Sequence, residues 1–95
     1  IEKVVEKCAH NPARIYQVKE RGFIREGYFA DLTLVDLDTP HTVGAENILY
    51  KCGWSPFEGA TFSSTICTTI VNGQVMYHEG QFQEQPKGMR LEFTR

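Results

Sequence analysis

The sequence predicts a mainly β domain that begins with a helix, an α+β arrangement. Apolar side chains recur at helical spacing in the first nine residues, "IEKVVEKCA". From residue 22 onward apolar and polar residues alternate instead, and "TTIVNGQVMY" places Asn-Gly between two alternating runs, which is typical of a β-hairpin. The chain has 95 residues, 41% of them hydrophobic, and this length suits a single small domain.

An amphipathic helix is predicted over residues 1–9. Ile1, Val4, Val5 and Cys8 follow an i, i+3, i+4, i+7 spacing, which places them on one face of a helix. Charged residues occupy the other face. We therefore interpret Cys8 as a small buried hydrophobic residue rather than a reactive thiol.

A second short helix is predicted after a break at residue 10. Asn11 is a favourable N-cap residue and Pro12 a favourable first helical residue, so this helix extends to about Tyr16. His10 then lies at the end of the first helix, where an imidazole can cap carbonyl groups or interact with the helix dipole.

A strand of about six residues is predicted in "ADLTLVDLD". It follows a short extended piece that starts at Gly22 and a turn at Gly27. Leu32, Leu34 and Val35 are the candidates for inward-facing side chains.

Aspartates flank this strand. Asp36 and Asp38 lie two residues apart at its end, where they can hold a cation or form an acid–base pair, but Asx-turns are the favoured interpretation. We expect Asp31, just before the strand, to accept hydrogen bonds from backbone amides of the preceding turn. "HTVG" then predicts a short edge strand.

The remaining chain predicts a loop, a hairpin and one more strand. Residues 44–63 are loop-like, and Asn72-Gly73 forms a two-residue turn of type I′ in the hairpin that follows. Leu91 and Phe93 alternate with polar residues in a possible final strand, which brings the expected total to five or six short strands.

No residue pattern assembles a catalytic or metal site. The histidines lack HxH, HxxxH and HExxH spacing, the cysteines lack CxxC, and no serine lies in a G-x-S-x-G context. We assign no catalytic residue, metal ligand or cofactor to this chain. The residues considered are His10, His41, His78, Cys8, Cys52, Cys67, Ser55, Ser63 and Ser64.

Composition disfavours nucleic acid and membrane partners. The net charge is -2, and ten basic and twelve acidic residues are spread along the chain without a basic patch. No apolar run approaches the ~20 residues of a membrane span. The three cysteines are widely spaced and odd in number, so a disulfide framework is not expected. This suits a reducing compartment, and we expect a cytoplasmic protein. The chain begins without Met and inside a helical pattern, which predicts a segment of a longer protein.

Two segments resemble the C-terminal signature of the amidohydrolase superfamily. "HNPA" matches an N-P-A motif, and "GFIREGYFADLTLVD" matches G-x-I-x-x-G-x-x-A-D-L-x-L-x-D. The matching positions are Asn11, Pro12, Ala13, Gly22, Ile24, Gly27, Ala30, Asp31, Leu32, Leu34 and Asp36.

A third segment, "KCGWSPFEG", resembles the K-x-x-x-[ST]-P-F-E-G element of the cyclic-amide hydrolases, a group that includes dihydroorotases, allantoinases and dihydropyrimidinases. "TTIVNGQVMY" resembles their hairpin. With Trp54 in the element and "GMRLEFTR" at the end, the resemblance is strongest to the dihydroorotases. The matching positions are Lys51, Ser55, Pro56, Phe57, Glu58 and Gly59, with Asn72 and Gly73 in the hairpin.

This resemblance implies a place within a larger enzyme. Residues 1–21 would be the end of the last helix of a metal-dependent (β/α)8 barrel and a connector, and residues 22–95 would belong to the small β-sandwich domain that flanks it. The parent would use zinc to cyclise N-carbamoyl-aspartate reversibly. Its metal ligands and catalytic base would lie upstream, so the partner of this chain would be its own barrel.

Two further implications concern exposed surface and Lys51. Outside the barrel, helix 1–9 would be partly exposed, and the sheet would have an open edge if a strand is missing. Lys51 belongs to the P-F-E-G element and is not the carboxylated lysine of the family. The alternatives are the same region of an allantoinase or dihydropyrimidinase-like hydrolase, and a stand-alone interaction module.

The segment 51–59 is interpreted as a structural clasp. Trp54 and Phe57 are large apolar anchors around the rigid Pro56, and we expect them to pin the loop onto a neighbouring surface. Lys51 and Glu58 are positioned to form an ion pair across the loop.

Overall fold

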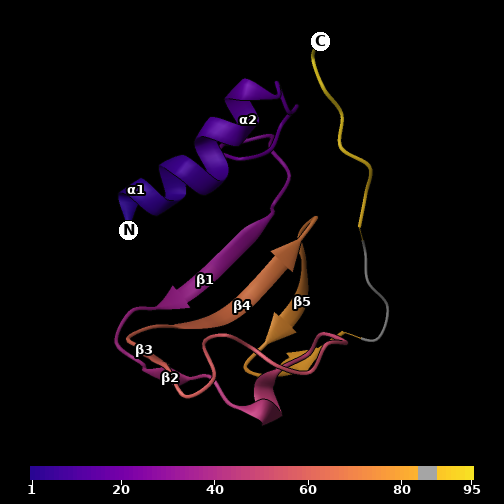
Figure 1. The fold of residues 1–95 in the computed structure, drawn as a ribbon. Helices are drawn as coiled ribbons and strands as arrows, with labels where there is room; N and C mark the ends of the chain where they lie inside the picture. The colour runs from indigo at the N-terminus through magenta and orange to yellow at the C-terminus, as the bar shows by residue number, and fades with distance from the viewer. Residues whose placement is uncertain (84–87) are drawn as a thin grey trace.

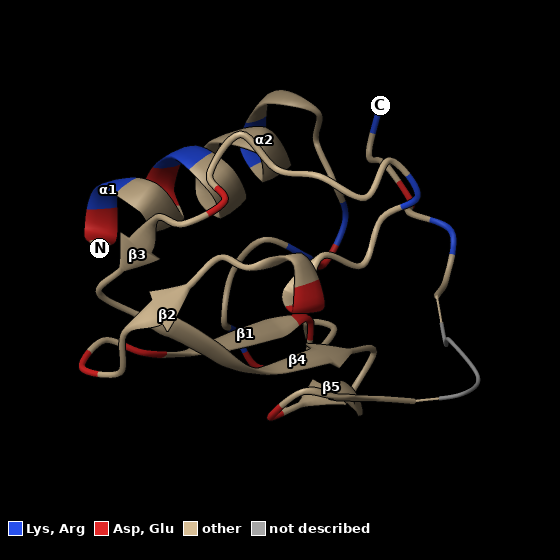
Figure 2. Ribbon diagram, turned by 60° about the horizontal axis from the view of Figure 1, so that its bottom comes forward, with Lys and Arg blue, Asp and Glu red and all other residues tan. Residues whose placement is uncertain are grey.

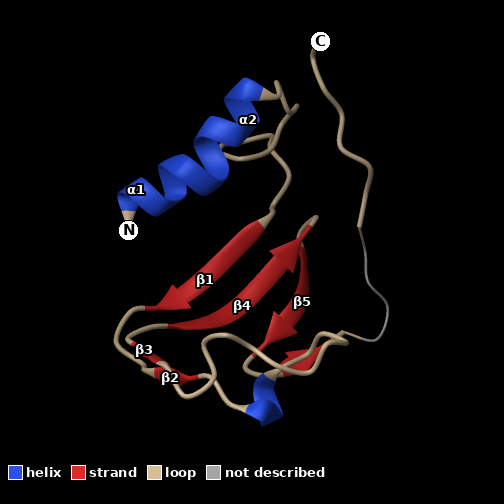
Figure 3. Cartoon of the chain, in the orientation of Figure 1, coloured by secondary structure: helices blue, strands red, loops and turns tan. Residues whose placement is uncertain are grey.

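The computed structural model describes residues 1–83 and 88–95. A helical segment at the N-terminus is followed by two antiparallel sheets (Figure 3). The chain is therefore mainly β with one N-terminal helical segment, as predicted. Its elements are α1 (Glu2–Val5), the π-helical turn η1 (Glu6–His10), α2 (Asn11–Ile15), β1 (Leu32–Asp36), β2 (His41–Thr42), the 3-10 turn η2 (Ala45–Asn47), β3 (Thr61–Phe62), β4 (Thr65–Val71), β5 (Gln74–His78) and β6 (Gln81–Phe82).

The helical segment runs without a break, so the predicted N-cap at Asn11 is wrong. Asn11 has helical dihedral angles, φ −65° and ψ −44°, and its N–H donates to the carbonyl of Glu6 five residues back. Pro12 has no N–H, and in an α-helix its ring would clash with the carbonyl four residues earlier. The wider π turn directly before Pro12 allows the helix to continue to Ile15.

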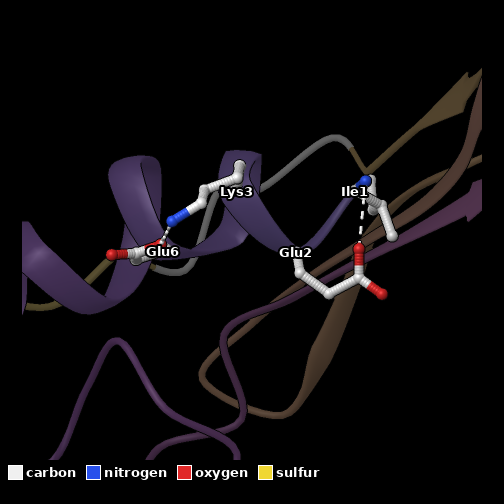
Figure 4. Close-up of polar contacts among 4 residues, drawn as sticks. All are labelled: Ile1, Glu2, Lys3 and Glu6. Atoms are coloured by element: carbon white, nitrogen blue, oxygen red, sulfur yellow. Dashed lines mark hydrogen bonds and ion pairs between the residues drawn. The ribbon is translucent and has the colours of Figure 1, made fainter.

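Two exposed ion pairs lie at the start of the helical segment. Lys3 Nζ lies 3.0 Å from Glu6 Oε2, and the terminal amine of Ile1 lies 3.4 Å from Glu2 Oε2 (Figure 4). Both pairs are exposed, so each contributes at most about 0.5 kcal/mol. These ion pairs therefore contribute little to the stability of the helical segment.

The larger sheet has the strand order β1-β4-β5-β6. The hairpin of β4 and β5 confirms the strongest local prediction. Its turn has positive φ at both central residues, 51° at Asn72 and 77° at Gly73, as a type I′ turn requires. β1 pairs antiparallel with β4, and its other edge pairs with no described strand.

A smaller sheet joins β2 to β3, with His41 opposite Phe62. The predicted edge strand at "HTVG" is confirmed. The partner strand β3 lies at the end of the segment predicted to be a loop, and β6 was not predicted at all.

The C-terminal tail returns to the connector after α2 rather than to the sheet (Figure 1). Phe93 forms an isolated bridge with Val18, and the Lys19 N–H donates to the Glu92 carbonyl at 2.8 Å. The possible final strand at Leu91 and Phe93 is therefore a single bridge and not a strand of the sheet.

The part of the chain that the structure describes has almost no hydrophobic core. Among the described residues the one buried hydrophobic residue is Ala13. The accessible surface is 7771 Å², whereas a compact protein of this mass exposes about 5,500 Å². The radius of gyration is 15.3 Å, compared with about 12 Å for a compact domain of this length.

Exposed apolar side chains gather on the helix and on the sheet. Cys8 is exposed, so its prediction as a buried residue is wrong for this chain. Leu34 and Val35, predicted to face inward, are exposed as well, while Leu32 is half-buried. No second layer covers the sheet within the described residues, which explains the exposure of Leu34 and Val35. The exposed helical residues include Ile1, Val4, Val5, Ile15 and Tyr16.

Gly22 packs tightly against the helical segment. Its φ is +83°, and a Cβ at this position would lie 2.4 Å from the Ala13 Cβ and 2.9 Å from the Ala9 carbonyl oxygen. The chain can therefore turn back along the helix only with glycine here.

We predict that Gly22→Ala lowers the free energy of unfolding by about 3 kcal/mol, because strain at positive φ adds to a backbone clash. Gly27→Ala is a matched control, since Gly27 has the same φ of +83° and open space around it. It should cost about 1 kcal/mol. Chemical denaturation of both variants measures the difference, and equal losses would contradict the tight packing.

Candidate functional site

The carboxylate of Asp31 joins three parts of the chain. Its Oδ1 accepts a hydrogen bond from the Asn72 N–H at 2.8 Å, and its Oδ2 forms an ion pair with Arg21. The Gly73 N–H donates to the carbonyl of Ala30 at 3.0 Å. The connector, the start of β1 and the hairpin turn therefore meet at one side chain.

This geometry corrects the expectation for Asp31. We expected it to accept hydrogen bonds from the preceding turn, but the amide it contacts belongs to Asn72, 41 residues further along the chain. Ala30-Asp31 and Asn72-Gly73, two pairs within the sequence motifs, are thus parts of one junction. The structure gives both pairs a role in packing.

Arg21 is the buried member of this junction. The residue is 8% exposed, and its guanidinium carbon lies 4.1 Å from the centroid of the Phe29 ring. A guanidinium stacked by its face keeps its N–H groups at the edge, where they meet the Asp31 carboxylate. Sequence reasoning missed Arg21 and Phe29, because a cation and an aromatic ring eight positions apart carry no local signal.

The backbone of the segment 51–59 is held by local hydrogen bonds. The Phe57 N–H donates to Ser55 Oγ at 3.1 Å, and the Gly59 N–H donates to the Val43 carbonyl at 2.8 Å. The Val43 N–H donates in return to the Ala60 carbonyl at 2.9 Å. These bonds attach the loop next to β2.

The apolar side chains of this loop project outward. Trp54 is 61% exposed and Phe57 is 58% exposed, and the described contact of Phe57 is an edge-on approach to Phe62 with ring centroids 5.9 Å apart. The expectation that these anchors pin the loop to a surface is not met within this chain. The predicted pair of Lys51 and Glu58 is also wrong, since no ion pair joins these two described residues.

The histidines make structural contacts. His10 lies inside the helical segment rather than at its end, and its ring stacks on Phe23 with centroids 4.3 Å apart and an interplanar angle of 8°. His78 Nδ1 lies 2.9 Å from the hydroxyl of Thr68, which is buried in β4. The expectation that His10 caps helix carbonyls is therefore wrong.

Asp36 ends β1 with an Asx-turn, as favoured from sequence. Its Oδ2 accepts a hydrogen bond from the Thr39 hydroxyl at 2.7 Å, and its Oδ1 accepts one from the Asp38 N–H at 2.9 Å. The Thr39 hydroxyl bond, followed by the Asp38 amide, holds the pKa of Asp36 below its ordinary value of 3.8.

No metal cluster forms among the described residues. In residues 1–83 and 88–95, no group of three or more His, Cys, Asp or Glu side chains is arranged to hold a metal ion. A small pocket of about 50 Å³ lies between the connector and the tail. No helix in this part of the chain is long and apolar enough to cross a membrane.

Charge is distributed unevenly over the fold. Figure 2 shows Lys and Arg on the helical segment, the connector and the tail, whereas the strands carry few charged residues. The candidate functional features are the Asp31 junction and the exposed apolar faces on the helix, the sheet and the loop.

Comparison with known proteins identifies a family to which this chain is similar. A protein-family model described as "Amidohydrolase family" matches residues 1–76. A dihydroorotase from Pyrococcus furiosus is 34% identical over 91 residues, which cover 96% of this chain and 22% of that protein. An allantoinase from Desulfitobacterium hafniense is 37% identical over 89 residues, which cover 94% of this chain and 20% of that protein.

A solved structure has a similar fold. The L-hydantoinase (dihydropyrimidinase) from Arthrobacter aurescens matches with a TM-score of 0.74 and 31% identity, over 87% of this chain and 19% of that structure. The chain thus spans about a fifth of the length of the relatives that it matches.

We predict that Asp31→Asn destabilises the protein by about 2 kcal/mol. Asparagine still accepts the Asn72 amide, but the buried Arg21 loses its counter-charge. Glu79→Gln, at an exposed position after β5, is the control and should cost less than about 0.5 kcal/mol. Thermal denaturation compares the two, and a loss at position 31 no larger than at position 79 would contradict the role of the junction.

The turn at Asp36 predicts a pH dependence. Its folded-state pKa is lowered, so its stabilising effect is complete above pH 3.8 and is lost as the pH falls through the lower folded-state pKa. An NMR titration of the Asp36 carboxyl should give a midpoint below 3.8. Thr39→Ala should move that midpoint up towards 3.8, and an unchanged midpoint would exclude the Thr39 hydroxyl as the main cause.

Proposed function

The chain belongs to the amidohydrolase family, and from this premise we propose that it is the C-terminal region of a dihydroorotase, where it braces the catalytic barrel. The observation that carries this proposal is the missing core. The chain exposes about 2,200 Å² more than a compact protein of its mass. A surplus of this size on one partner is typical of obligate interfaces.

The exposed apolar residues lie on several separate elements. Val4 and Val5 on α1, Leu34 and Val35 on β1, and Trp54 in the loop are all exposed. Exposed apolar surface on this scale is typical of faces that contact another protein surface. We infer that the rest of a longer parent protein covers these surfaces.

We propose the same division of the chain as the sequence predicted. Residues 1–21 are the end of the last barrel helix and a connector, and residues 22–95 belong to the C-terminal β-domain. In this division of the chain, the Asp31 junction fixes the β-domain relative to the helix that leads into it.

In this proposal the catalytic groups lie in the rest of the parent protein. The described residues bring together no metal ligands, so they do not fit a zinc ion, and we assign them no step of the reaction. The zinc of the parent, its small-molecule substrate and its cytoplasmic location are inferred from the family resemblance. The chain itself would contribute rigidity and buried area.

A second candidate is the same region of an allantoinase. The relative from Desulfitobacterium hafniense, named an allantoinase, is as similar to this chain as the dihydroorotase relatives are. The dihydropyrimidinase-like alternative is supported by the similar solved structure. A stand-alone interaction module is less well supported, because it leaves the surplus surface uncovered.

We predict that the full-length parent protein interconverts N-carbamoyl-aspartate and dihydroorotate and that it does not hydrolyse allantoin or hydantoins. Steady-state assays on the three substrates distinguish the candidates. The isolated 95-residue chain should be inactive on all of them. Activity on allantoin alone would replace the first candidate by the second, and activity of the isolated chain would contradict the bracing role.

We also predict that Trp54→Ala destabilises the full-length parent by about 3 kcal/mol, because the indole is then buried against another part of the protein. Glu58→Gln in the same loop is the control and should stay within about 0.5 kcal/mol of the parent. Denaturant titrations measure both variants. A Trp54→Ala effect as small as the control would mean that the loop is exposed in the whole protein.

A further inference from the structure

A cluster of cations lies on one aromatic ring between α2 and the turn at residues 22–28. The guanidinium carbon of Arg25 lies 4.2 Å from the centroid of the Phe23 ring, and that of Arg14 lies 5.1 Å from it. The imidazole of His10 stacks on the same ring at 4.3 Å. Phe23 thus holds two arginine side chains, one from the helix and one from the turn, in defined positions.

A cation–π contact leaves a guanidinium free to form hydrogen bonds. A guanidinium that packs by its face on a ring still presents its N–H donors in the plane of the group. Arg25 donates one of them to the Tyr28 hydroxyl at 3.5 Å, a neutral partner at a long distance. In the described part of the chain, neither Arg14 nor Arg25 forms an ion pair.

At the Asp31 junction an arginine also lies on an aromatic ring, and there it binds a carboxylate. There Arg21 stacks on Phe29 at 4.1 Å, nearly the distance of Arg25 from Phe23, and its edge binds the Asp31 carboxylate. The cluster at Phe23 has the ring and the cation but lacks the carboxylate. The Asp31 junction therefore indicates that the cluster at Phe23 is suited to bind a carboxylate.

Neighbouring residues indicate that the missing carboxylate belongs to a protein. Ile15 and Tyr16 follow Arg14, Ile24 precedes Arg25, and all three are exposed. Arginine and tyrosine among apolar side chains are typical of the energetically important part of a protein interface. A small soluble anion would leave these apolar side chains in water.

We propose that Arg14 and Arg25 bind an Asp or Glu carboxylate in the part of the parent protein outside residues 1–95. This rests on the proposed function, because it requires a longer protein that covers the chain. Docking removes water from the cluster, which strengthens the ion pair relative to one at an open surface. The cluster then sets the orientation of the helix on that partner surface, since a fork of N–H donors accepts a carboxylate in few geometries.

Zero-length cross-linking of the full-length protein tests this proposal. Arg25→Lys and, separately, Arg14→Lys place a reactive amine where the guanidinium was. A carbodiimide then couples an amine directly to a carboxylate that it contacts, and peptide mass spectrometry identifies the link. We expect Lys at position 25 or 14 to be joined to an Asp or Glu outside the 95 residues. The native pair of Lys19 and Glu92, 3.4 Å apart, is the internal positive control.

The proposal would be overturned by no link at either position, by links only to carboxylates within residues 1–95, or by a link to a second copy of the chain. Arg95→Lys is a matched control, because Arg95 stacks on a different ring, Phe93, at 4.8 Å. A link from position 95 to the same carboxylate in equal yield would also overturn it. Adding Phe23→Leu to Arg25→Lys should lower the yield several-fold, since the ring no longer positions the side chain.

The outcome is independent of catalysis. A parent protein that processes N-carbamoyl-aspartate but gives no link would contradict this proposal and leave the proposed function standing. A link in a protein that acts only on allantoin would support the carboxylate contact and contradict the dihydroorotase assignment.

Discussion

The structure depends on the Asp31 carboxylate. One oxygen accepts the Asn72 amide in the hairpin turn, and the other binds Arg21 in the connector after the helix. Hydrophobic packing cannot take over this task, because Ala13 is the one buried hydrophobic residue among those described. A charged, partly buried pair is costly to break. It therefore holds the helical segment, β1 and the hairpin in one arrangement although the described residues form almost no apolar interior.

The small hydrophobic core is also the basis of the proposal that this chain is part of a longer protein. Its sheet is uncovered, its helix exposes an apolar face, and its loop presents Trp54 and Phe57 to solvent. In an isolated domain these exposed apolar faces would favour aggregation. The chain spans about a fifth of the length of the relatives that it matches, and in the proposed function the rest of a longer protein covers these faces. Polar contacts such as Asp31 fix the internal geometry, and apolar faces remain available for docking.

Sequence patterns predicted the local elements well and the long-range contacts poorly. The hairpin at Asn72-Gly73, the strand at Leu32–Asp36 and the short strand at His41 follow from alternation and turn chemistry, which act over a few residues. The continuous helix at Asn11 was missed because a π turn accommodates Pro12. Arg21 with Phe29 and Arg25 with Phe23 were missed because stacking leaves no periodic signal. Burial of Cys8 and Leu34 was predicted from amphipathic patterns, which report what a face is suited to contact and not whether this chain supplies the contact.

The central claim is that the apolar faces of this chain are covered by the rest of a longer protein. Hydroxyl-radical footprinting of the full-length parent, compared with the isolated chain, tests it most directly, because it reports the exposure of individual side chains. The account predicts that Val4, Leu34, Trp54 and Phe57 are strongly protected in the parent, while Leu32, half-buried already, changes little. Equal labelling of Trp54 and Phe57 in the two forms would contradict it.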